Sequence, residues 1–223
     1  MSMENVMYKF KNQMVFILAL LLSACSMNQT SSIPYFSDID LSPTWISSSE
    51  VSPSTVRSVG SFSFVDQKNK VVSNESLQGK PYVASFFFVD CTNVCPTLKT
   101  RLTLVQQHFS EGEIRIVSHS VAPNTDTVQR LANYSKVNEI NSDQWHLVTG
   151  NQEQVVKLAT ERYGAQLTNQ SGQGDLESDY LHTEILYLVD KDGFLRGMYN
   201  GTLQLEVERL MVDASVLVEE SQK

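Results

Sequence analysis

The stretch Phe86 to Pro96, which reads FFFVDCTNVCP, joins an aromatic run to two cysteines four positions apart. Aromatic residues favour β-strands, and a continuous apolar run is typical of a strand buried on both faces. Proline suits the first turn of a helix, where its missing N–H has no intrahelical partner. The stretch therefore predicts a buried strand, a loop that carries Cys91 and Cys95, and a helix that begins beside them.

This cysteine pair suits thiolate chemistry. The amino end of a helix presents unpaired N–H groups and the positive end of its dipole, which favour a thiolate over a thiol. Thiolates bind soft metals and attack disulfides. A structural disulfide or two reduced core cysteines would show the same spacing, and C-x3-C alone does not decide among them. The position at the tip of a core strand, where α/β proteins place function, favours a functional pair.

Strand and helix patterns alternate through the rest of the chain. The expected elements are a hairpin at 62–72, a strand at 82–89, a helix at 96–109, a strand at 114–118, a helix at 128–134, a strand at 145–148, a helix capped by Asn151, a hairpin at 184–199 and a helix at 203–218. This order predicts an α/β fold, a mixed sheet flanked by helices with an N-terminal β-hairpin. Cysteines after the first central strand are typical of the thioredoxin superfamily.

We expect an export signal at the start of the chain. Lys9 and Lys11 precede an apolar run at 14–22, which is too short to span a bilayer but fits a signal peptide. The run ends in LSAC at 22–25, which resembles the bacterial lipobox, where cleavage precedes acylation of the cysteine. We expect residues 1–24 to be a lipoprotein signal peptide and Cys25 to be lipidated. The protein would then be exported and anchored to a bacterial membrane, with its domain in the periplasm.

Residues 26–57 are rich in Ser, Thr, Asn and Pro and show no helical or strand period. The sequence predicts a flexible tether at 25–57 and one domain at 58–223. Three isolated aromatic residues in this range, Tyr35, Phe36 and Trp45, have no predicted packing site. With 41% hydrophobic and 19% charged residues the chain is an ordinary globular protein, and its net charge of −8 argues against nucleic-acid binding.

Four further segments accompany the cysteine stretch, in order along the chain. They are SVAPNTDT at 120–127, WHLVTG at 145–150, YLHT at 180–183 and YLVDKDG at 187–193. Together with Phe86 to Pro96 they resemble the SCO/SenC family of copper-binding, thioredoxin-like proteins, which help to assemble the copper A centre of cytochrome c oxidase. The resemblance covers about residues 60–212. Val89, Thr92 and Ala122 depart from the family pattern; Ala122 stands where an aspartate is usual.

The resemblance implies that Cys91, Cys95 and His182 bind one copper ion. Two thiolates and an imidazole suit Cu(I) and can also hold Cu(II). Thioredoxins carry a proline before the strand that faces the cysteine loop, whereas His182 falls near that position here and the last proline is Pro123. His119 is a candidate either to contact a metal ligand or to serve as an alternative metal ligand.

Two other histidines have structural interpretations. We expect His108 to be solvated on its helix and His146 to be packed in its strand. Asp90 is adjacent to Cys91, and its carboxylate would oppose a thiolate if it pointed toward the sulfur.

The resemblance implies a membrane-tethered metallochaperone for the copper A centre, acting by copper delivery, by reduction of target cysteines, or both. Its partners would be the copper A subunit of the oxidase and a thiol reductant or another copper chaperone. The alternative is an enzyme, a thiol–disulfide oxidoreductase or peroxidase-like protein that uses Cys91 and Cys95 as a redox pair without stored copper. Enzymatic activity is left open by the sequence.

Overall fold

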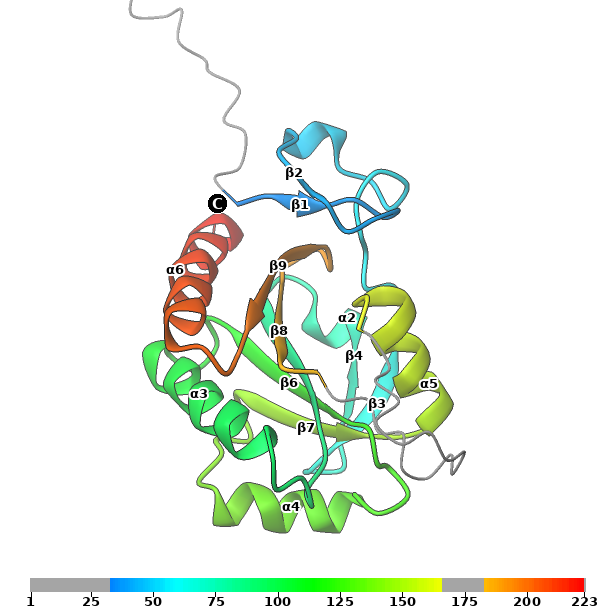
Figure 1. The fold of residues 1–223 in the computed structure, drawn as a ribbon, viewed down its shortest axis with the longest axis vertical. Helices are drawn as coiled ribbons and strands as arrows, with labels where there is room; N and C mark the ends of the chain where they lie inside the picture. Colours follow the sequence, from blue (N-terminus) through cyan, green and yellow to red (C-terminus); the bar gives the residue numbers. More distant parts are fainter. Residues whose placement is uncertain (1–32, 166–182, 223) are drawn as a thin grey trace, which may run out of the picture.

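The computed structural model describes residues 33–165 and 183–222 and is shown as a ribbon in Figure 1. Its main sheet consists of β3 (Ser63–Asp66), β4 (Val71–Ser73), β5 (Tyr82–Phe87), β6 (Arg115–Ser120), β7 (Trp145–Thr149), β8 (Ile185–Val189) and β9 (Leu195–Asn200). The strands lie in the order β4-β3-β7-β6-β5-β8-β9. β5, β6 and β7 are parallel, and the other pairings are antiparallel. The mixed sheet and its N-terminal hairpin, β3–β4, are confirmed.

Helices cover both faces of this sheet (Figure 1). They are α2 (Asn74–Leu77), α3 (Cys95–His108), α4 (Val128–Val137), α5 (Gln152–Lys157), its π-helical continuation η2 (Leu158–Arg162) and α6 (Gln204–Ser221). Apolar residues of α3, α4 and α6 share one core, and those of α5 and η2 belong to the other. Thr127 caps α4 through the N–H of Arg130, and Asn151 caps α5 through the N–H of Gln154. These short polar side chains satisfy amide groups that the first turn leaves unpaired.

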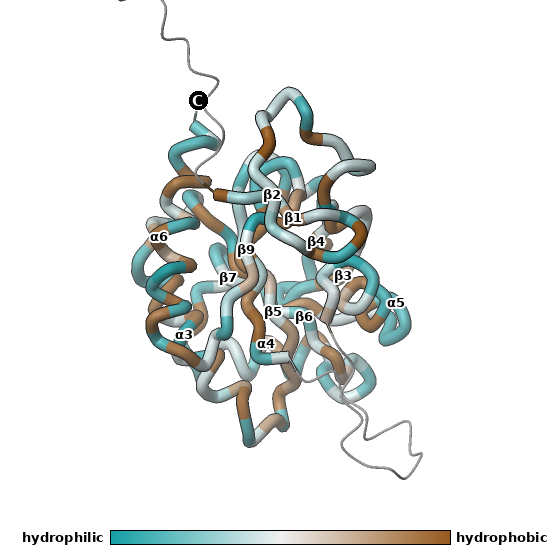
Figure 2. Tube along the Cα trace, turned by 45° about the horizontal axis from the view of Figure 1, so that its top comes forward, coloured by the Kyte–Doolittle hydropathy of each residue, from teal (hydrophilic) through white to brown (hydrophobic). Residues whose placement is uncertain are grey.

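β5 is the central strand, and all six of its residues are buried. Because side chains alternate across a strand, Val83 and Phe87 enter the α3–α6 core, while Ala84 and Phe86 enter the opposite core. Each large apolar side chain buried in this way stabilises the fold by about 1.5–3 kcal/mol. The hydropathy colouring of Figure 2 shows the hydrophobic stretches of the central strands between helices with hydrophilic outer turns. The carboxyl end of β5 leads directly into the cysteine loop.

Residues 33–57 differ from the flexible tether predicted at 25–57. They form a two-stranded sheet of β1 (Tyr35–Phe36) and β2 (Pro43–Thr44), followed by the 3-10 helix η1 (Ser48–Glu50). Tyr35 and Phe36, two of the unassigned aromatics, are buried. The guanidinium of Arg196 lies 3.9 Å from the centre of the Tyr35 ring. The tether prediction is therefore wrong for residues 33–57, because long-range contacts order a segment that has no local period.

No helix in the described residues, 33–165 and 183–222, has the length and apolar character needed to cross a membrane.

Candidate metal centre

Cys91 and Cys95 lie together where β5 gives way to α3. The N–H of Cys91 donates to the carbonyl of Phe88 at 3.2 Å, which turns the chain after the strand. Cys95 is the first residue of α3, and its N–H donates to Sγ of Cys91 at 3.4 Å. Both residues are buried and carry free thiols. The helix therefore begins at the cysteines, as the sequence predicts, and one of its unpaired N–H groups points at a sulfur.

The electrostatics of Cys95 differ from the prediction that its thiolate is favoured. Burial, followed by the hydrogen bond with Cys91, raises the pKa of the Cys95 thiol well above its ordinary value. Desolvation disfavours the thiolate at this sulfur. Cys95 is therefore a neutral thiol near pH 7 in the metal-free protein. A cation held by both sulfurs would offset the cost of burying their negative charge, because metal binding and thiol deprotonation are linked.

The buried carboxylate of Asp126 accepts a hydrogen bond from the backbone of the cysteine loop. Oδ2 of Asp126 accepts hydrogen bonds from the N–H of Val89 at 3.1 Å and from the hydroxyl of Ser120 at 2.7 Å. Burial raises the pKa of Asp126, although these hydrogen bonds oppose the shift. Its Oδ1 has no hydrogen-bond partner and lies 3.8 Å from Nη1 of Arg130. Asp126 thus links the loop after β5 to the end of β6.

Arg130 also forms an ion pair with Asp90, the residue that precedes Cys91. The pairing occupies the Asp90 carboxylate, whose side chain is 65% exposed. The charge beside Cys91 is therefore neutralised by a cation on α4.

Tyr134 is a further neighbour of the cysteines. Its ring centre lies 5.9 Å from that of Phe87. Burial raises the pKa of Tyr134 to about 12, and charge on Cys95 and Cys91 contributes to the shift. Sequence reasoning missed the roles of Asp126, Arg130 and Tyr134 at this loop. Their spacing at successive four-residue intervals, around a helix capped by Thr127, could have indicated a common face.

The third predicted ligand, His182, lies outside the described residues, as does the predicted lipidation site, Cys25. In the described part of the chain, no three His, Cys, Asp or Glu side chains gather in a way that could hold a metal. The second described range begins at Thr183, two residues before β8. β8 pairs antiparallel with β5, from Tyr82 opposite Val189 to Ala84 opposite Tyr187. The start of β8 is therefore directed toward the carboxyl end of β5, from which the cysteine loop leaves.

His119 lies in the aromatic core on the face opposite the cysteines. Its ring stacks on Phe86 at 5.3 Å and makes edge contacts with Phe62 and Phe64. Neither ring nitrogen has a hydrogen-bond partner, and burial lowers the pKa of His119 to about 3. His119 is a neutral core residue in this structure, and it makes no described contact with either sulfur.

The other two histidines take the places that the sequence predicts. His108 is exposed on α3. His146 is largely buried in β7, where its Nδ1 lies 3.0 Å from Oδ2 of the buried Asp66.

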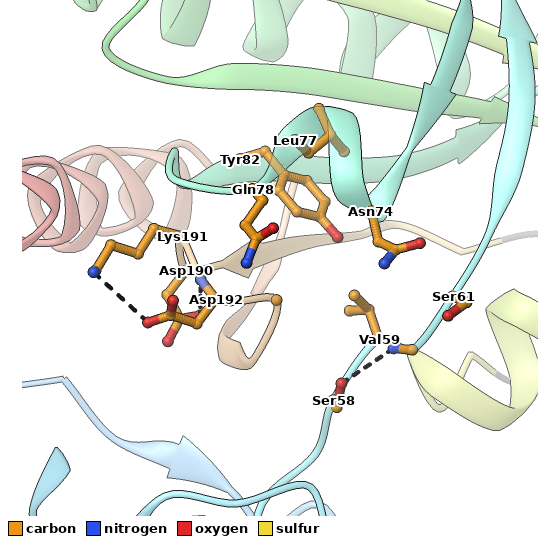
Figure 3. Close-up of a pocket in the computed structure, with 12 residues that line it drawn as sticks. Ser58, Val59, Ser61, Asn74, Leu77, Gln78, Tyr82, Asp190, Lys191 and Asp192 are labelled. Atoms are coloured by element: carbon orange, nitrogen blue, oxygen red, sulfur yellow. Dashed lines mark hydrogen bonds and ion pairs between the residues drawn. The ribbon is translucent and has the colours of Figure 1, made fainter. Parts of the chain in front are cut away.

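A polar cavity of about 250 Å³ lies at the other end of β5 (Figure 3). Its lining includes Asn74, Gln78, Tyr82, Lys191 and Asp192. Tyr82 begins β5, whereas the cysteines follow its last residue. The cavity is thus separate from the thiol chemistry and contains no cysteine in its lining.

The sheet and its cysteine loop define a thioredoxin-like protein with a C-x3-C pair. The chain belongs to the SCO1/SenC family, whose model matches residues 51–213. A SCO1 protein homolog from Bacillus subtilis is 29% identical over 155 residues, which cover 68% of this chain and 78% of the relative.

Two solved structures of the same family are similar to this fold. BsSco, described as a member of the Sco family of cytochrome c oxidase assembly proteins with a disulfide switch, is 28% identical with a TM-score of 0.62; the match covers 73% of this chain and 94% of BsSco. ScoI of Bradyrhizobium japonicum with copper bound is 26% identical with a TM-score of 0.56; that match covers 71% of this chain and 98% of ScoI.

Proposed function

We propose that this protein is a membrane-tethered copper metallochaperone that assists assembly of the copper A centre of cytochrome c oxidase. The observation that carries the proposal is the buried thiol pair Cys91 and Cys95 at the end of the central strand of a SCO1/SenC chain. Copper delivery to the oxidase subunit, reduction of that subunit's cysteines, or both would be the activity. The copper-bound ScoI structure and the assembly role stated for BsSco support this reading.

The donor set fits copper. Two sulfurs held at one helix terminus are soft ligands that suit Cu(I), and an imidazole from His182 would complete a site that also accepts Cu(II). The antiparallel pairing of β5 with β8 supports His182 as the third ligand, since the chain that enters β8 comes from the cysteine end of the sheet. When bound, copper would supply a transferable metal cargo. Asp126 would hold the loop backbone at Val89, and Arg130 would neutralise Asp90 beside Cys91.

A second candidate function, thiol–disulfide exchange, is favoured by the contact between the two cysteines. The N–H of Cys95 lies 3.4 Å from Sγ of Cys91, so the residues are close enough for the sulfurs to approach one another. In such an exchange, a thiolate attacks a disulfide sulfur, the partner's second sulfur leaves as a thiolate, and the second cysteine then resolves the mixed disulfide. The disulfide switch stated for BsSco supports this chemistry. Copper binding and exchange would compete for the same sulfurs.

The predicted export signal and the LSAC sequence at 22–25 support acylation of Cys25 and a periplasmic domain. Outside the cytoplasm, cysteine pairs oxidise readily. A thiol reductant would therefore have to act on Cys91 and Cys95 before copper enters.

The experiment that tests the proposal is a paired titration of wild type and His182→Ala with Cu(I) and with Cu(II). We expect Cu(II) affinity to fall most, because two thiolates can still hold Cu(I) in a linear site whereas Cu(II) loses its imidazole. His108→Ala, which removes an exposed histidine from α3, is the matched control and should bind both ions as wild type does. Unchanged Cu(II) affinity in His182→Ala would remove His182 from the site and favour the exchange function.

A further inference from the structure

The folded domain begins close to the predicted lipid anchor. Ile33 is buried, and its carbonyl accepts a hydrogen bond from Nη2 of Arg196 at 2.9 Å. The next carbonyl, that of Pro34, accepts from Nε of the same guanidinium at 3.1 Å. The chain is therefore fixed to the domain from residue 33 onward. Eight Cα–Cα steps separate Cys25 from Ile33, and they can span at most about 29 Å.

This attachment point lies at the end of the molecule opposite the cysteine loop. Arg196, which holds Ile33, also pairs with Asp190 at 3.1 Å. Asp190 follows Val189, which is opposite Tyr82 at the amino end of β5. β5 itself extends about 17 Å from Tyr82 to Phe87 before the cysteines are reached. Figure 1 shows the same arrangement, with β1 and β2 at one end and α4 with the start of α3 at the other.

Two large apolar side chains are exposed on the β1–β2 segment. Ile39, in the loop between the strands, is 94% exposed, and Trp45, directly after β2, is 58% exposed. The pairing of Tyr35 with Thr44 brings Trp45 alongside the point where the chain enters the domain. Hydrophobic stretches in this outermost segment are visible in Figure 2. Isolated exposed apolar residues are common, but tryptophan beside a lipid anchor has a natural environment in the membrane interface.

We propose that the β1–β2 segment contacts the lipid surface through Ile39 and Trp45 and thereby holds the domain with Cys91 and Cys95 directed away from the membrane. This inference rests on the lipid anchor of the proposed function. The eight-residue connection from Cys25 to Ile33 keeps this end of the domain within about 29 Å of the bilayer. The two side chains determine which surface meets it. The cysteine loop would then meet a partner's metal site held above the membrane surface.

The charges on the segment specify the kind of lipid contact. Asp38, Asp40 and Glu50 are exposed there, and Arg57 lies 3.5 Å from Asp38. An acidic surface is repelled by anionic headgroups, so the contact is apolar and interfacial. We therefore expect a closer contact with zwitterionic phosphatidylcholine than with vesicles rich in an anionic lipid.

Tryptophan fluorescence tests the inference on the full-length acylated protein. The chain has two tryptophans, and Trp145 is 2% exposed in the core, so Trp45 alone can report on lipid. In phosphatidylcholine vesicles with brominated acyl chains, we expect quenching of Trp45 emission relative to unbrominated vesicles. Trp45→Phe should lose that quenching, and Ile39→Ser should reduce it.

A matched variant tests the orientation. Val137, the last residue of α4 at the cysteine end, is 81% exposed. A tryptophan placed there, by Val137→Trp in a Trp45→Phe background, should remain unquenched. Equal emission of Trp45 in brominated and unbrominated vesicles, or quenching of the tryptophan at position 137, would overturn the inference. Copper binding by the same preparation would still leave the proposed function intact. Absence of acyl chains on Cys25 by mass spectrometry would overturn it as well.

Discussion

Buried polar groups near the two ends of β5 differ in how they are paired. At the amino end, the Arg196 side chain is 1% exposed, and it donates to the carbonyls of Ile33 and Pro34 and pairs with Asp190. At the carboxyl end, two thiols are buried with no disulfide, and Oδ1 of Asp126 is buried without a hydrogen-bond partner. The first arrangement pairs its charges within the chain, whereas the second holds two buried thiols and a carboxylate oxygen that accepts no hydrogen bond.

This difference separates a structural site from a chemical one. Burying a group that must ionise to act costs stability, and such costs are typical of functional sites. The buried thiol of Cys95, with its raised pKa, is an example: its thiolate becomes favourable only when a cation arrives. Arg196 and Asp190 need no such partner. Substitutions at the cysteine end should therefore change copper affinity, and substitutions at the Arg196 end should change the free energy of unfolding.

The largest effect is expected from Cys91→Ser or Cys95→Ser. Each variant removes a proposed copper ligand. Copper affinity should therefore fall by more than the roughly 10–100-fold typical of changing a residue that hydrogen-bonds to a ligand without touching the metal. An equilibrium competition assay under reducing conditions would measure the loss. Cys25→Ser in the same assay is the control and should bind copper normally. Retention of wild-type affinity by both loop variants would place the copper site elsewhere.

Arg196→Met should lower the free energy of unfolding by about 3–5 kcal/mol, because Asp190 would be left buried without its cation. Copper affinity of the folded fraction should be unchanged, since the residue lies at the far end of β5. Chemical denaturation measures the first quantity. Arg209→Met is the matched control: Arg209 is 71% exposed and pairs with Asp213 on the surface, so its loss should cost less than about 1 kcal/mol. Similar losses for both variants would contradict the structural role assigned to Arg196.

The same contrast explains what the sequence could reveal. The strand, the cysteines and the helix of the candidate site are adjacent in the chain, so their aromatic run, spacing and proline predicted them. The packing of residues 33–57 depends on Arg196, whose partners Ile33 and Pro34 are 163 and 162 positions away. A local pattern carries no signal for such a contact.

Two features of the site show the same limit. Asp126 belongs to a segment that the sequence singles out, yet its hydrogen bond to Val89 spans 37 positions and appears only in the fold. The raised pKa of Cys95 also escaped prediction, because helix position is readable from sequence whereas the depth of burial of one sulfur is not.

His119 provides a smaller test, on the aromatic face behind the cysteines. Its folded-state pKa of about 3 lies below the unfolded value of about 6.5, so the unfolded state takes up the proton first as the pH falls. The contribution of neutral His119 to the free energy of unfolding is fully present above about pH 6.5. It is lost progressively toward about pH 3, with about 2 kcal/mol lost by pH 5. His119→Leu should remove this part of the pH dependence. Urea denaturation of both proteins at pH 7 and pH 5 measures it, and equal pH sensitivity would contradict a neutral, unpartnered His119.

Arg130→Gln should have the smallest effect on stability. Its ion pair with Asp90 is partly exposed, and such pairs contribute about 0.2–1 kcal/mol. Its Nη1 lies 3.8 Å from Oδ1 of the buried Asp126, beyond hydrogen-bond distance, and Asp126 keeps its hydrogen bonds to Val89 and Ser120. Thermal or chemical unfolding would measure this change. A loss of several kcal/mol would instead indicate that the loop depends on Arg130 as strongly as the amino end depends on Arg196.

Anaerobic copper titration of the reduced protein tests the central claim most directly. We predict one copper ion bound per chain when Cys91 and Cys95 are thiols, and loss of that binding when the pair is oxidised to a disulfide. Metal content by elemental analysis, with a thiol count on the same sample, gives both numbers. Zero copper bound by the fully reduced protein, or equal binding by the reduced and oxidised forms, would contradict a metallochaperone that works through these two sulfurs.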